Sequence, residues 1–362
     1  MTTSATSIIK KLLVLFLVFA GLYYAKAFLM PLAIGGVLAT LFLPFSKWLE
    51  HKKIPKSLAV LICLIVLLLA ITGVGMLLGW QIAELSNDFE RIKLGAVEKI
   101  QHIQEYILLH FGISAKNQTL ALKEQQPFFT DIVTSMVGSM TNVFTNFILI
   151  LVYIFCMLFY RNHIKNFLIK LSTPSQRKEM ELVVSSAAKV SQQYLFGLTK
   201  MIVCLWIMYG IGFTLLGVKN ALFFAILCGL LEVIPFLGNI VGTTLTILVA
   251  AVNGASLPML GGIAATYGIV QLIQGWILEP LIVGPQVKIN PFTTIIVLVI
   301  GGLIWGIPGI FIAIPLIAMF KIVFDHVEQL KPYGYLIGEV ETKKDVPVII
   351  EKIKKQVSKL IK

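Results

Sequence analysis

The stretch that decides the fold is residues 58–80, LAVLICLIVLLLAITGVGMLLGW, which contains no charged side chain. As an α-helix it extends about 35 Å, enough to cross the ~30 Å hydrocarbon core of a bilayer. Similar apolar blocks recur at about residues 12–30, 31–46, 136–160, 191–217 and 257–283. The sequence therefore predicts an all-α polytopic membrane protein.

The composition of the whole chain agrees with this prediction. Of the 362 residues, 57% are apolar and only 13% are charged, and the mean hydropathy is +0.90. A soluble domain carries about 25% charged residues. These values exclude a soluble globular enzyme and a disordered chain.

The net charge of +12 comes from 30 Lys and Arg against 18 Asp and Glu. Basic cytoplasmic loops explain such a balance in a polytopic protein. No basic stretch is interleaved with aromatic residues, so we expect no nucleic-acid partner. The cysteines lie far apart within apolar blocks and predict neither a disulfide framework nor a metal site, and no cofactor is expected. They are Cys63, Cys156, Cys204 and Cys228.

Polarity divides the chain into six regions. Residues 1–80 hold three spans, 81–135 form a polar segment, 136–160 form a fourth span, 161–190 form a basic helical segment, 191–320 form an apolar region with broken spans, and 321–362 form a basic tail. This organisation predicts about eight spans, with broken or re-entrant helices in the C-terminal half.

Local signals predict where individual helices begin and end. Pro31 is expected to separate the first span from the second. Thr173-Pro174-Ser175-Gln176 predicts the start of a helix that continues into the span at 191–217 and ends at Gly217.

The distribution of basic residues predicts the orientation. The N-terminus, residues 47–57, residues 161–190 and the tail from 321 together hold 21 of the 30 Lys and Arg residues. The positive-inside rule puts these segments in the cytoplasm with both termini, and puts 81–135 outside it.

The 81–135 segment contains a helix with an apolar stripe, because its apolar residues recur every three or four positions. Two interpretations remain open: the helix packs on its own domain, or it makes a subunit contact outside the bilayer. The second predicts a homo-oligomer with contacts at Leu85, Phe89 and Ile92.

The tail contains a basic amphipathic helix that begins near Asp345. Its apolar face includes Ile353 and Val357, and its lysines face away. Such a helix often lies on anionic membrane lipid, although a soluble tail that only sets the topology is the alternative.

The region 191–320 contains two irregular apolar stretches. Residues 221–252 would make about 48 Å of straight helix, too long for one crossing, and Pro235, Gly238 and Gly242 interrupt them. Residues 292–320 are interrupted in the same way, at Gly301-Gly302, Gly306, Pro308-Gly309 and Pro315. Either 221–252 is one broken crossing, or it crosses twice and 292–320 is a re-entrant hairpin.

Glu232 is the ionisable residue that points most clearly to function. An ionisable side chain at membrane depth is a candidate functional site. Pro235 lacks an N–H and frees backbone carbonyls close to Glu232, while Gly238 permits a sharp turn. Transporters bind cations and polar substrates at such broken helices. The alternative is a protonated glutamate with a purely structural hydrogen bond.

A second group of polar residues follows further along the chain. Gln271, Gln274 and Glu279 lie along part of one helix face, which should turn towards the bundle or a water path because polar groups facing lipid are costly. Interhelical hydrogen bonding is the structural alternative. The complete predicted pathway set is Glu232, Pro235, Gly238, Asn239, Gln271, Gln274, Glu279, Pro280, Asn290 and Pro291.

The sequence lacks the motifs of the common hydrolases and nucleotide-binding proteins, including HExxH, GxSxG and the P-loop. We therefore expect no enzyme and no ATP site. A secondary transporter is the favoured function, and an oligomeric channel or a structural membrane scaffold is the alternative.

The polar and glycine-proline motifs of residues 231–315, taken together and in order, resemble those of the autoinducer-2 exporter family of bacterial permeases. The resemblance extends from about Lys10 to Phe320. It is carried by three motifs: Leu231-Glu232-x-Ile234-Pro235-x-x-Gly238; Gln271 to Pro291 with Glu279-Pro280, Gly284 and Asn290-Pro291; and Gly301-Gly302-x-x-x-Gly306-x-x-Gly309 with Pro315.

The resemblance implies a multi-pass protein of the bacterial cytoplasmic (inner) membrane. It implies export of a small polar signal or, as in other members, exchange of sodium or lithium for protons. It also implies a homo-oligomer, and a pentamer in particular.

Overall fold

The computed structural model describes residues 5–87, 109, 145–232, 237–283 and 288–339. Within these residues the chain is helical and forms no β-strand, apart from one isolated bridge between Ile289 and Gly338. The all-α prediction is therefore confirmed for the part that is described. The 81–135 segment and the tail helix lie almost entirely outside it.

Five of the described helices are long and apolar enough to cross a membrane, and a bent pair brings the number to six. They are α2 (Lys26–His51), α3 (Lys56–Asn87, apolar to Trp80), α8 (Arg177–Leu215, with its leading turn), α11 (Leu257–Ile273, with residues up to Glu279), α14 (Ile307–His326), and the pair formed by Thr145–Phe159 and α7 (Arg161–Lys170). The structure thus supports a polytopic membrane protein, while the number of eight spans stays a prediction.

The first two helices are divided at a different residue from the one expected. α1 (Ala5–Tyr24) ends before Ala25, and α2 begins at Lys26. Pro31 lies inside α2, so the expectation that it separates the two spans was wrong. Its ring removes only one donor, the partner of the Ala27 carbonyl, and the helix continues past that single loss.

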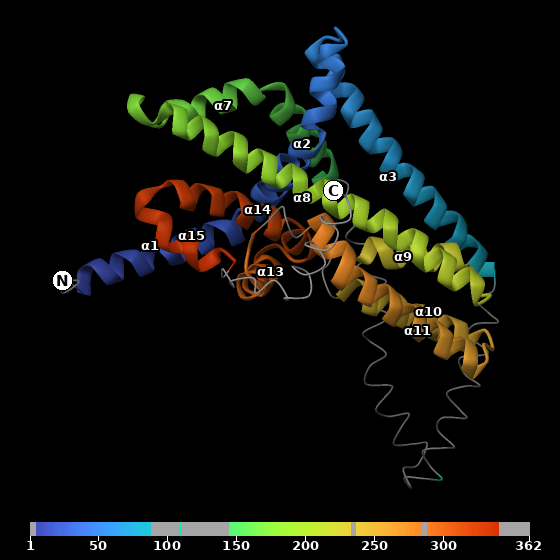
Figure 1. The fold of residues 1–362 in the computed structure, drawn as a ribbon. Helices are drawn as coiled ribbons and strands as arrows, with labels where there is room; N and C mark the ends of the chain where they lie inside the picture. Colours follow the sequence, from blue (N-terminus) through green and yellow to red (C-terminus); the bar gives the residue numbers. More distant parts are fainter. Residues whose placement is uncertain (1–4, 88–108, 110–144, 233–236, 284–287, 340–362) are drawn as a thin grey trace, which may run out of the picture.

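Helix α8 is the central element of the fold, and it crosses the molecule diagonally in Figure 1. Leu205, Tyr209 and Phe213 on α8 are completely buried in the main core. α8 follows a single tight turn at Pro174–Gln176, so the predicted helix start is confirmed. Its predicted end is confirmed as well, because Gly217 adopts a positive φ of 71° directly after it.

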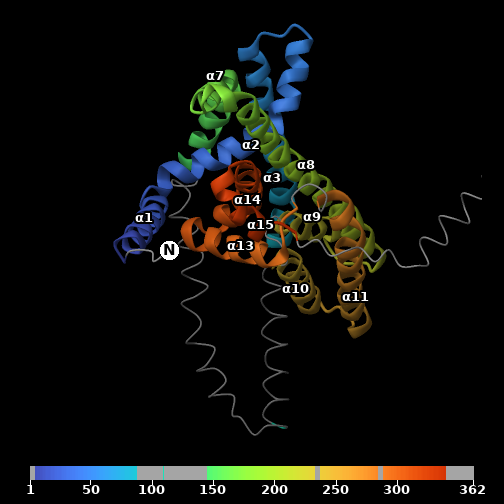
Figure 2. The same cartoon turned by 60° about the vertical axis from the view of Figure 1, so that its left-hand side comes forward.

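Helices α9 (Ala221–Leu231) and α10 (Leu237–Val252) form an antiparallel hairpin beside α8 and α11 (Figure 2). A Cβ on Gly242 would lie 2.7 Å from the Cys228 sulfur, and one on Gly238 would overlap the Leu231 carbonyl. The two helices have 11 and 16 residues, or about 16 and 24 Å, and neither crosses the ~30 Å core alone. The 221–252 region is therefore a hairpin and not one broken crossing.

A second hairpin joins α13 (Pro291–Trp305) to α14. Gly306 alone makes the turn, with a positive φ of 67° that a side chain would strain. Gly301 and Gly309 face each other across the hairpin so closely that a Cβ on Gly301 would lie 2.6 Å from the Gly309 carbonyl oxygen. The predicted interruption of 292–320 is thus confirmed at Gly306. The expected breaks at Gly301-Gly302 and Pro315 were wrong, because α13 continues through the two glycines and α14 continues past Pro315, which removes only one hydrogen bond.

The C-terminal described part consists of a single turn (Glu328–Leu330) and α15 (Lys331–Ile337), which pack on α14.

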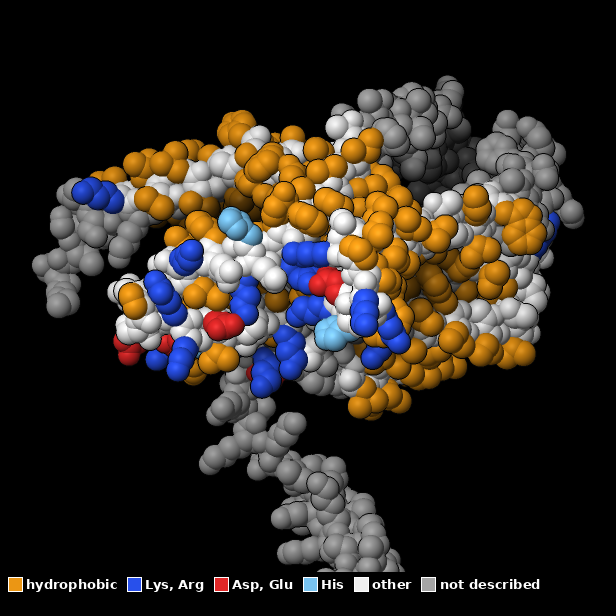
Figure 3. Space-filling view, turned by 90° about the horizontal axis from the view of Figure 1, so that it is seen from above, with side chains coloured by type: hydrophobic (Ala, Val, Ile, Leu, Met, Phe, Trp, Pro, Cys, Tyr) orange, Lys and Arg blue, Asp and Glu red, His pale blue; other side chains and the backbone are white. Residues whose placement is uncertain are grey.

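At the end of the molecule seen in Figure 3, Lys and Arg side chains gather while apolar side chains cover the surrounding surface. Arg161 and Glu50 form an ion pair, with 2.5 Å between Nη2 and Oε2. This pair holds the bend between Phe159 and α7 against the end of α2.

Candidate functional site

Glu232 lies at the tip of the α9–α10 hairpin, where it follows the last residue of α9. Its side chain is only 4% exposed although it carries a carboxyl group. The hairpin forms here because α9 ends and the small residue Gly238 lets α10 approach the Leu231 carbonyl. A carboxyl group is thus held at the point where a membrane helix ends inside the protein.

The depth of this tip follows from its neighbours on α8. A Cβ on Gly229 would meet the Trp206 ring and lie 3.2 Å from the Ile202 carbonyl oxygen. Ile202 and Trp206 lie near the middle of the apolar stretch 191–217. Glu232 is three residues beyond Gly229, which is less than one helical turn of about 5.4 Å. The carboxyl group therefore lies close to the middle of the membrane domain.

Three amide side chains connect this carboxyl group to α10 and α11. The Gln274 Nε2 donates to Glu232 Oε1 at 2.5 Å. The Asn239 Nδ2 donates to Gln274 Oε1 at 2.7 Å and to Gln271 Oε1 at 3.3 Å. Asn239 and Gln274 are 1% and 4% exposed. Residues far apart in the sequence thus form one buried polar chain across the hairpin and the neighbouring span.

Several oxygen atoms of this region have no hydrogen-bond partner. Among the described residues, four side-chain atoms are both buried and unpaired: Tyr209 Oη, Glu232 Oε2, Asn239 Oδ1 and Thr243 Oγ1. Three of the four belong to the hairpin, and Thr243 follows Asn239 by one turn on the same helix face. Buried polar atoms are nearly always paired in folded proteins. Oxygen atoms of these kinds can coordinate a cation or form a hydrogen bond with a ligand, so this is the candidate site.

The helix that carries Gln274 is widened at that residue. From Gln274 to Val283 the chain forms a π-helix, which continues α11 with hydrogen bonds between residues five apart. Such segments are rare and occur frequently at functional sites. α8 approaches it closely at Gly197, where a Cβ would lie 2.7 Å from the Ile282 carbonyl oxygen. The widened helix places the Gln274 amide between Glu232 and Asn239.

Glu279 lies on the same π-helix, five residues beyond Gln274, and its side chain is exposed. Among the described residues, the hydrogen bonds of the polar chain do not include Glu279. The structure therefore brings Glu232, Asn239, Gln271 and Gln274 together and leaves Glu279 at the edge of this group.

Asn290 and Pro291 lie outside this group of polar residues. The Asn290 Oδ1 accepts from the Thr293 backbone N–H at 2.8 Å and caps α13, and Pro291 occupies the first turn. The Asn290 Nδ2 donates to the carbonyl oxygens of Leu336 at 2.6 Å and Gly338 at 2.9 Å. Asn290 thus fastens the end of α15 to the start of α13.

The bonds of Asn290 predict a structural effect for Asn290→Ala. The variant loses the cap and two hydrogen bonds to carbonyl oxygens, which together correspond to about 2–3 kcal/mol. We expect a lower melting temperature in detergent. If the protein transports a solute, as the sequence predicts, the rate of that transport per folded molecule should stay at the wild-type level. Asn253→Ala, at an exposed loop position, is the matched control. An unchanged melting temperature with lost flux would instead return Asn290 to the transport pathway.

Some of the other predicted residues lie outside the part of the chain that the structure describes. Pro235 lies among residues 233–236, Phe89 and Ile92 lie among residues 88–108, and all three are outside the described residues. Leu85 belongs to the last turns of α3, and Pro280 lies within the π-helix. Within the described ranges, no three His, Cys, Asp or Glu side chains converge as a metal site requires.

Sequence reasoning missed Thr243 and Tyr209. Threonine is common in membrane helices, where its hydroxyl usually bonds to the backbone of its own helix, as Thr246 does to Gly242 at 2.8 Å. The position of Thr243 four residues after Asn239 is the signal that could have found it. Tyr209 gives no local signal, since it resembles any other aromatic residue of an apolar span.

Comparison with known proteins agrees with this architecture. The sequence profile of the family described as "AI-2E family transporter" matches residues 12–329. Three relatives carry the name "Putative transport protein". YueF of Bacillus subtilis is 26% identical over 317 residues, covering 83% of this chain and 84% of its own length. YrrI of the same organism is 24% identical over 84% and 88%, and YhhT of Escherichia coli K12 is 24% identical over 94% and 96%.

The profile match covers nearly the whole membrane domain, including both hairpins and the buried polar chain. The resemblance seen in the sequence motifs is therefore confirmed, and the apolar helices agree with a protein of this kind. This chain belongs to the AI-2E family of membrane transporters.

Proposed function

We propose that this protein is a secondary transporter in which Glu232 exchanges a proton for a monovalent cation. The observation that carries the proposal is the set of unpaired buried oxygens on the α9–α10 hairpin: Glu232 Oε2, Asn239 Oδ1 and Thr243 Oγ1. A carboxylate, an amide carbonyl and a hydroxyl are the oxygen ligands that hard cations prefer.

The protonation of Glu232 provides the coupling. When Glu232 carries a proton, its group is neutral and a buried position costs little. When the proton leaves, the buried carboxylate needs a compensating positive charge, which a cation bound to the three oxygens supplies. Proton and cation therefore compete for one site, and each crossing carries one or the other.

The hairpin supports a mechanism with access from both sides. Its short helices enter the membrane domain and return, and transporters bind their substrates at such helix ends near the midplane. The contacts at Gly229, Gly238 and Gly242 allow close packing of α9 against its neighbours.

A second candidate is the export of a small polar solute such as autoinducer-2. The amides of Asn239, Gln271 and Gln274 would bind its hydroxyl groups, and Gln271 is only partly buried. In this case Glu232 couples solute export to proton entry. The family name supports this candidate, and the all-oxygen composition of the unpaired atoms favours the cation.

Flux in proteoliposomes tests the proposed function. An outward proton gradient should drive uptake of sodium or lithium above its equilibrium level. A channel would only equilibrate the cation, and a scaffold would give no flux above protein-free vesicles. Uptake of autoinducer-2 into inverted vesicles, without any cation effect, would favour the second candidate.

We also propose the orientation that the charge distribution predicts, in a bacterial cytoplasmic membrane with both termini inside the cell. A homo-oligomer, with Leu85, Phe89 and Ile92 at its contact, belongs to the same proposal. The segment 81–135 would then face the exterior, and the basic tail would contact membrane lipid inside the cell.

Single-cysteine labelling tests this orientation. In a chain whose four natural cysteines are replaced, a cysteine at Ser114 should react with an impermeant thiol reagent in intact cells. A cysteine at Ser175, an exposed position before α8, should react only after the cells are opened. The reverse pattern of labelling would invert the proposed topology.

A further inference from the structure

A cleft of about 600 Å³ lies between α2, the Thr145–Phe159 helix, α7 and the first half of α8, and its lining includes none of the residues of the buried polar chain. Cavities that enclose small ligands have volumes of about 300–1,000 Å³. Four basic residues line the cleft, and no acidic residue does: Lys47, Arg161, Lys165 and Lys189. The remaining lining is apolar or uncharged, so the cleft combines a cationic part with an apolar wall.

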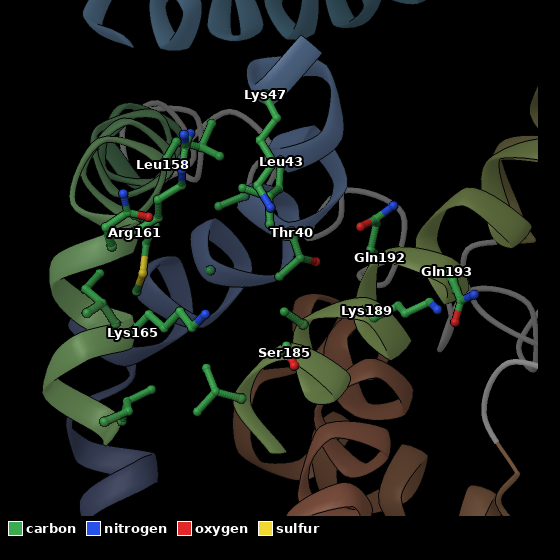
Figure 4. A pocket seen from close by; sticks show the side chains of 18 residues that line it. Thr40, Leu43, Lys47, Leu158, Arg161, Lys165, Ser185, Lys189, Gln192 and Gln193 are labelled. Carbon is green, nitrogen blue, oxygen red and sulfur yellow. The ribbon is translucent and has the colours of Figure 1, made fainter. Parts of the chain in front are cut away.

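The four cations are arranged on three sides of the cleft. Figure 4 shows Lys47 on α2 and Lys165 on α7, both extending into the space between the helices, and Lys189 on α8. Arg161 is held by its ion pair with Glu50, and Lys165 contacts Glu181 at 2.6 Å on the exposed surface. Lys47 and Lys189 have no carboxylate partner among the described residues. The cleft therefore keeps a positive charge after its internal pairs are counted.

Aromatic residues place this cleft at the surface of the bilayer. Trp48, Tyr160 and Phe167 beside it are each more than half exposed. Trp and Tyr concentrate at the membrane–water interface, where lipid headgroups lie. The chain also bends by 69° between Phe159 and Arg161, so α7 leaves the direction of the preceding span at this level. The cations of the cleft are thus at the depth of lipid phosphates.

The apolar wall distinguishes a lipid from a free anion. Leu43, Met157, Leu158, Val184 and Ala188 form this wall next to the basic side chains. An inorganic phosphate would use only the cations and leave the wall in contact with water. A phospholipid would use both, with its phosphate on the lysines and the start of its acyl chains on the wall.

We propose that this cleft is a binding site for an anionic phospholipid. Lys47 on α2 and Lys189 on α8, the two cleft lysines without a carboxylate partner among the described residues, contact the headgroup phosphate, and Arg161 and Lys165 line the cleft beside them within their ion pairs. The Thr40–Ser191 hydrogen bond, with 2.9 Å between the two hydroxyl oxygens, joins α2 to α8 beside the cleft. A lipid bound here bridges α2, α7 and α8, the last of which also packs on the Glu232 hairpin.

Lipid binding to the full-length protein in detergent tests the proposal. The probe is phosphatidylglycerol with a fluorescent acyl chain, followed by polarisation. The variant Lys47→Gln/Lys189→Gln removes the two cleft lysines that have no carboxylate partner among the described residues, and its affinity should fall roughly 30-fold, since each lysine near an anionic headgroup contributes about fivefold. The matched control is Lys170→Gln/Lys178→Gln, which removes two exposed lysines of the same segment outside the cleft. Its affinity should change by about twofold at most.

A second variant protects the test against a folding defect. Ser185→Glu retains all the lysines and puts a carboxylate at an exposed position of the cleft, one turn from Lys189. It should weaken phosphatidylglycerol binding while the melting temperature stays unchanged. Equal affinity in all variants, or equal loss in the control, would overturn the proposal. Displacement of the probe by inorganic phosphate or phosphatidylcholine as readily as by phosphatidylglycerol would also overturn it.

Discussion

Glu232→Gln is expected to abolish proton-driven cation uptake and to leave the folded protein intact. Glutamine keeps the size of the side chain and an oxygen that can accept from the Gln274 amide, whose nitrogen lies 2.5 Å from Glu232 Oε1. It cannot release a proton, and it has no charge to hold a cation. Uptake in proteoliposomes should therefore fall to the level of protein-free vesicles.

Stability measurements separate this effect from misfolding. Glu232→Gln should melt at the same or a higher temperature in detergent, because a buried ionisable group becomes neutral. Glu179→Gln, which changes an exposed carboxylate on α8, is the control and should retain full uptake. Full uptake by Glu232→Gln, together with loss in Glu279→Gln, would move the coupling role to Glu279.

The second large effect is expected at Gly238, where α10 meets the end of α9. A Cβ here would overlap the backbone carbonyl of Leu231, which cannot rotate away as a side chain would. Gly238→Ala must therefore push the hairpin apart, at a cost of about 3 kcal/mol or more. We expect a much lower melting temperature in detergent and loss of flux.

Gly261→Ala is the matched control, since it also lies in an apolar helix. A Cβ at Gly261 meets no atom within 4 Å, and alanine favours a helix over glycine by about 0.5–1 kcal/mol. Gly261→Ala should therefore melt at the wild-type temperature or slightly above it. Equal melting temperatures for the two variants would contradict the close contact at the hairpin tip.

The sequence predicts the membrane helices because each requires a long run of apolar residues. It also predicts the interruptions at Gly306 and near Gly238, since positive φ values and close backbone contacts require glycine. It does not distinguish a hairpin from one broken crossing at 221–252. That difference depends on α9 packing against α10, a contact between the two halves of the stretch that leaves no pattern in the sequence.

The polar residues of the candidate site were predictable to a similar extent. Glu232, Asn239, Gln271 and Gln274 are conspicuous because polar groups are rare in apolar helices, and the structure joins them by hydrogen bonds. Asn290 is equally conspicuous, but its partners are 46 and 48 residues away, at the end of α15. Such a long-range contact leaves no periodic pattern, so the sequence alone does not separate a capping residue from a ligand.

Proton release on cation binding tests the central claim most directly, because it needs no vesicle. Purified protein in weakly buffered detergent, with a soluble pH dye, receives a pulse of sodium or lithium chloride. If the cation displaces the proton of Glu232, wild-type protein should release about one proton per chain, while Glu232→Gln should release none. The absence of release from folded wild-type protein with sodium, lithium and potassium would contradict cation–proton exchange at Glu232.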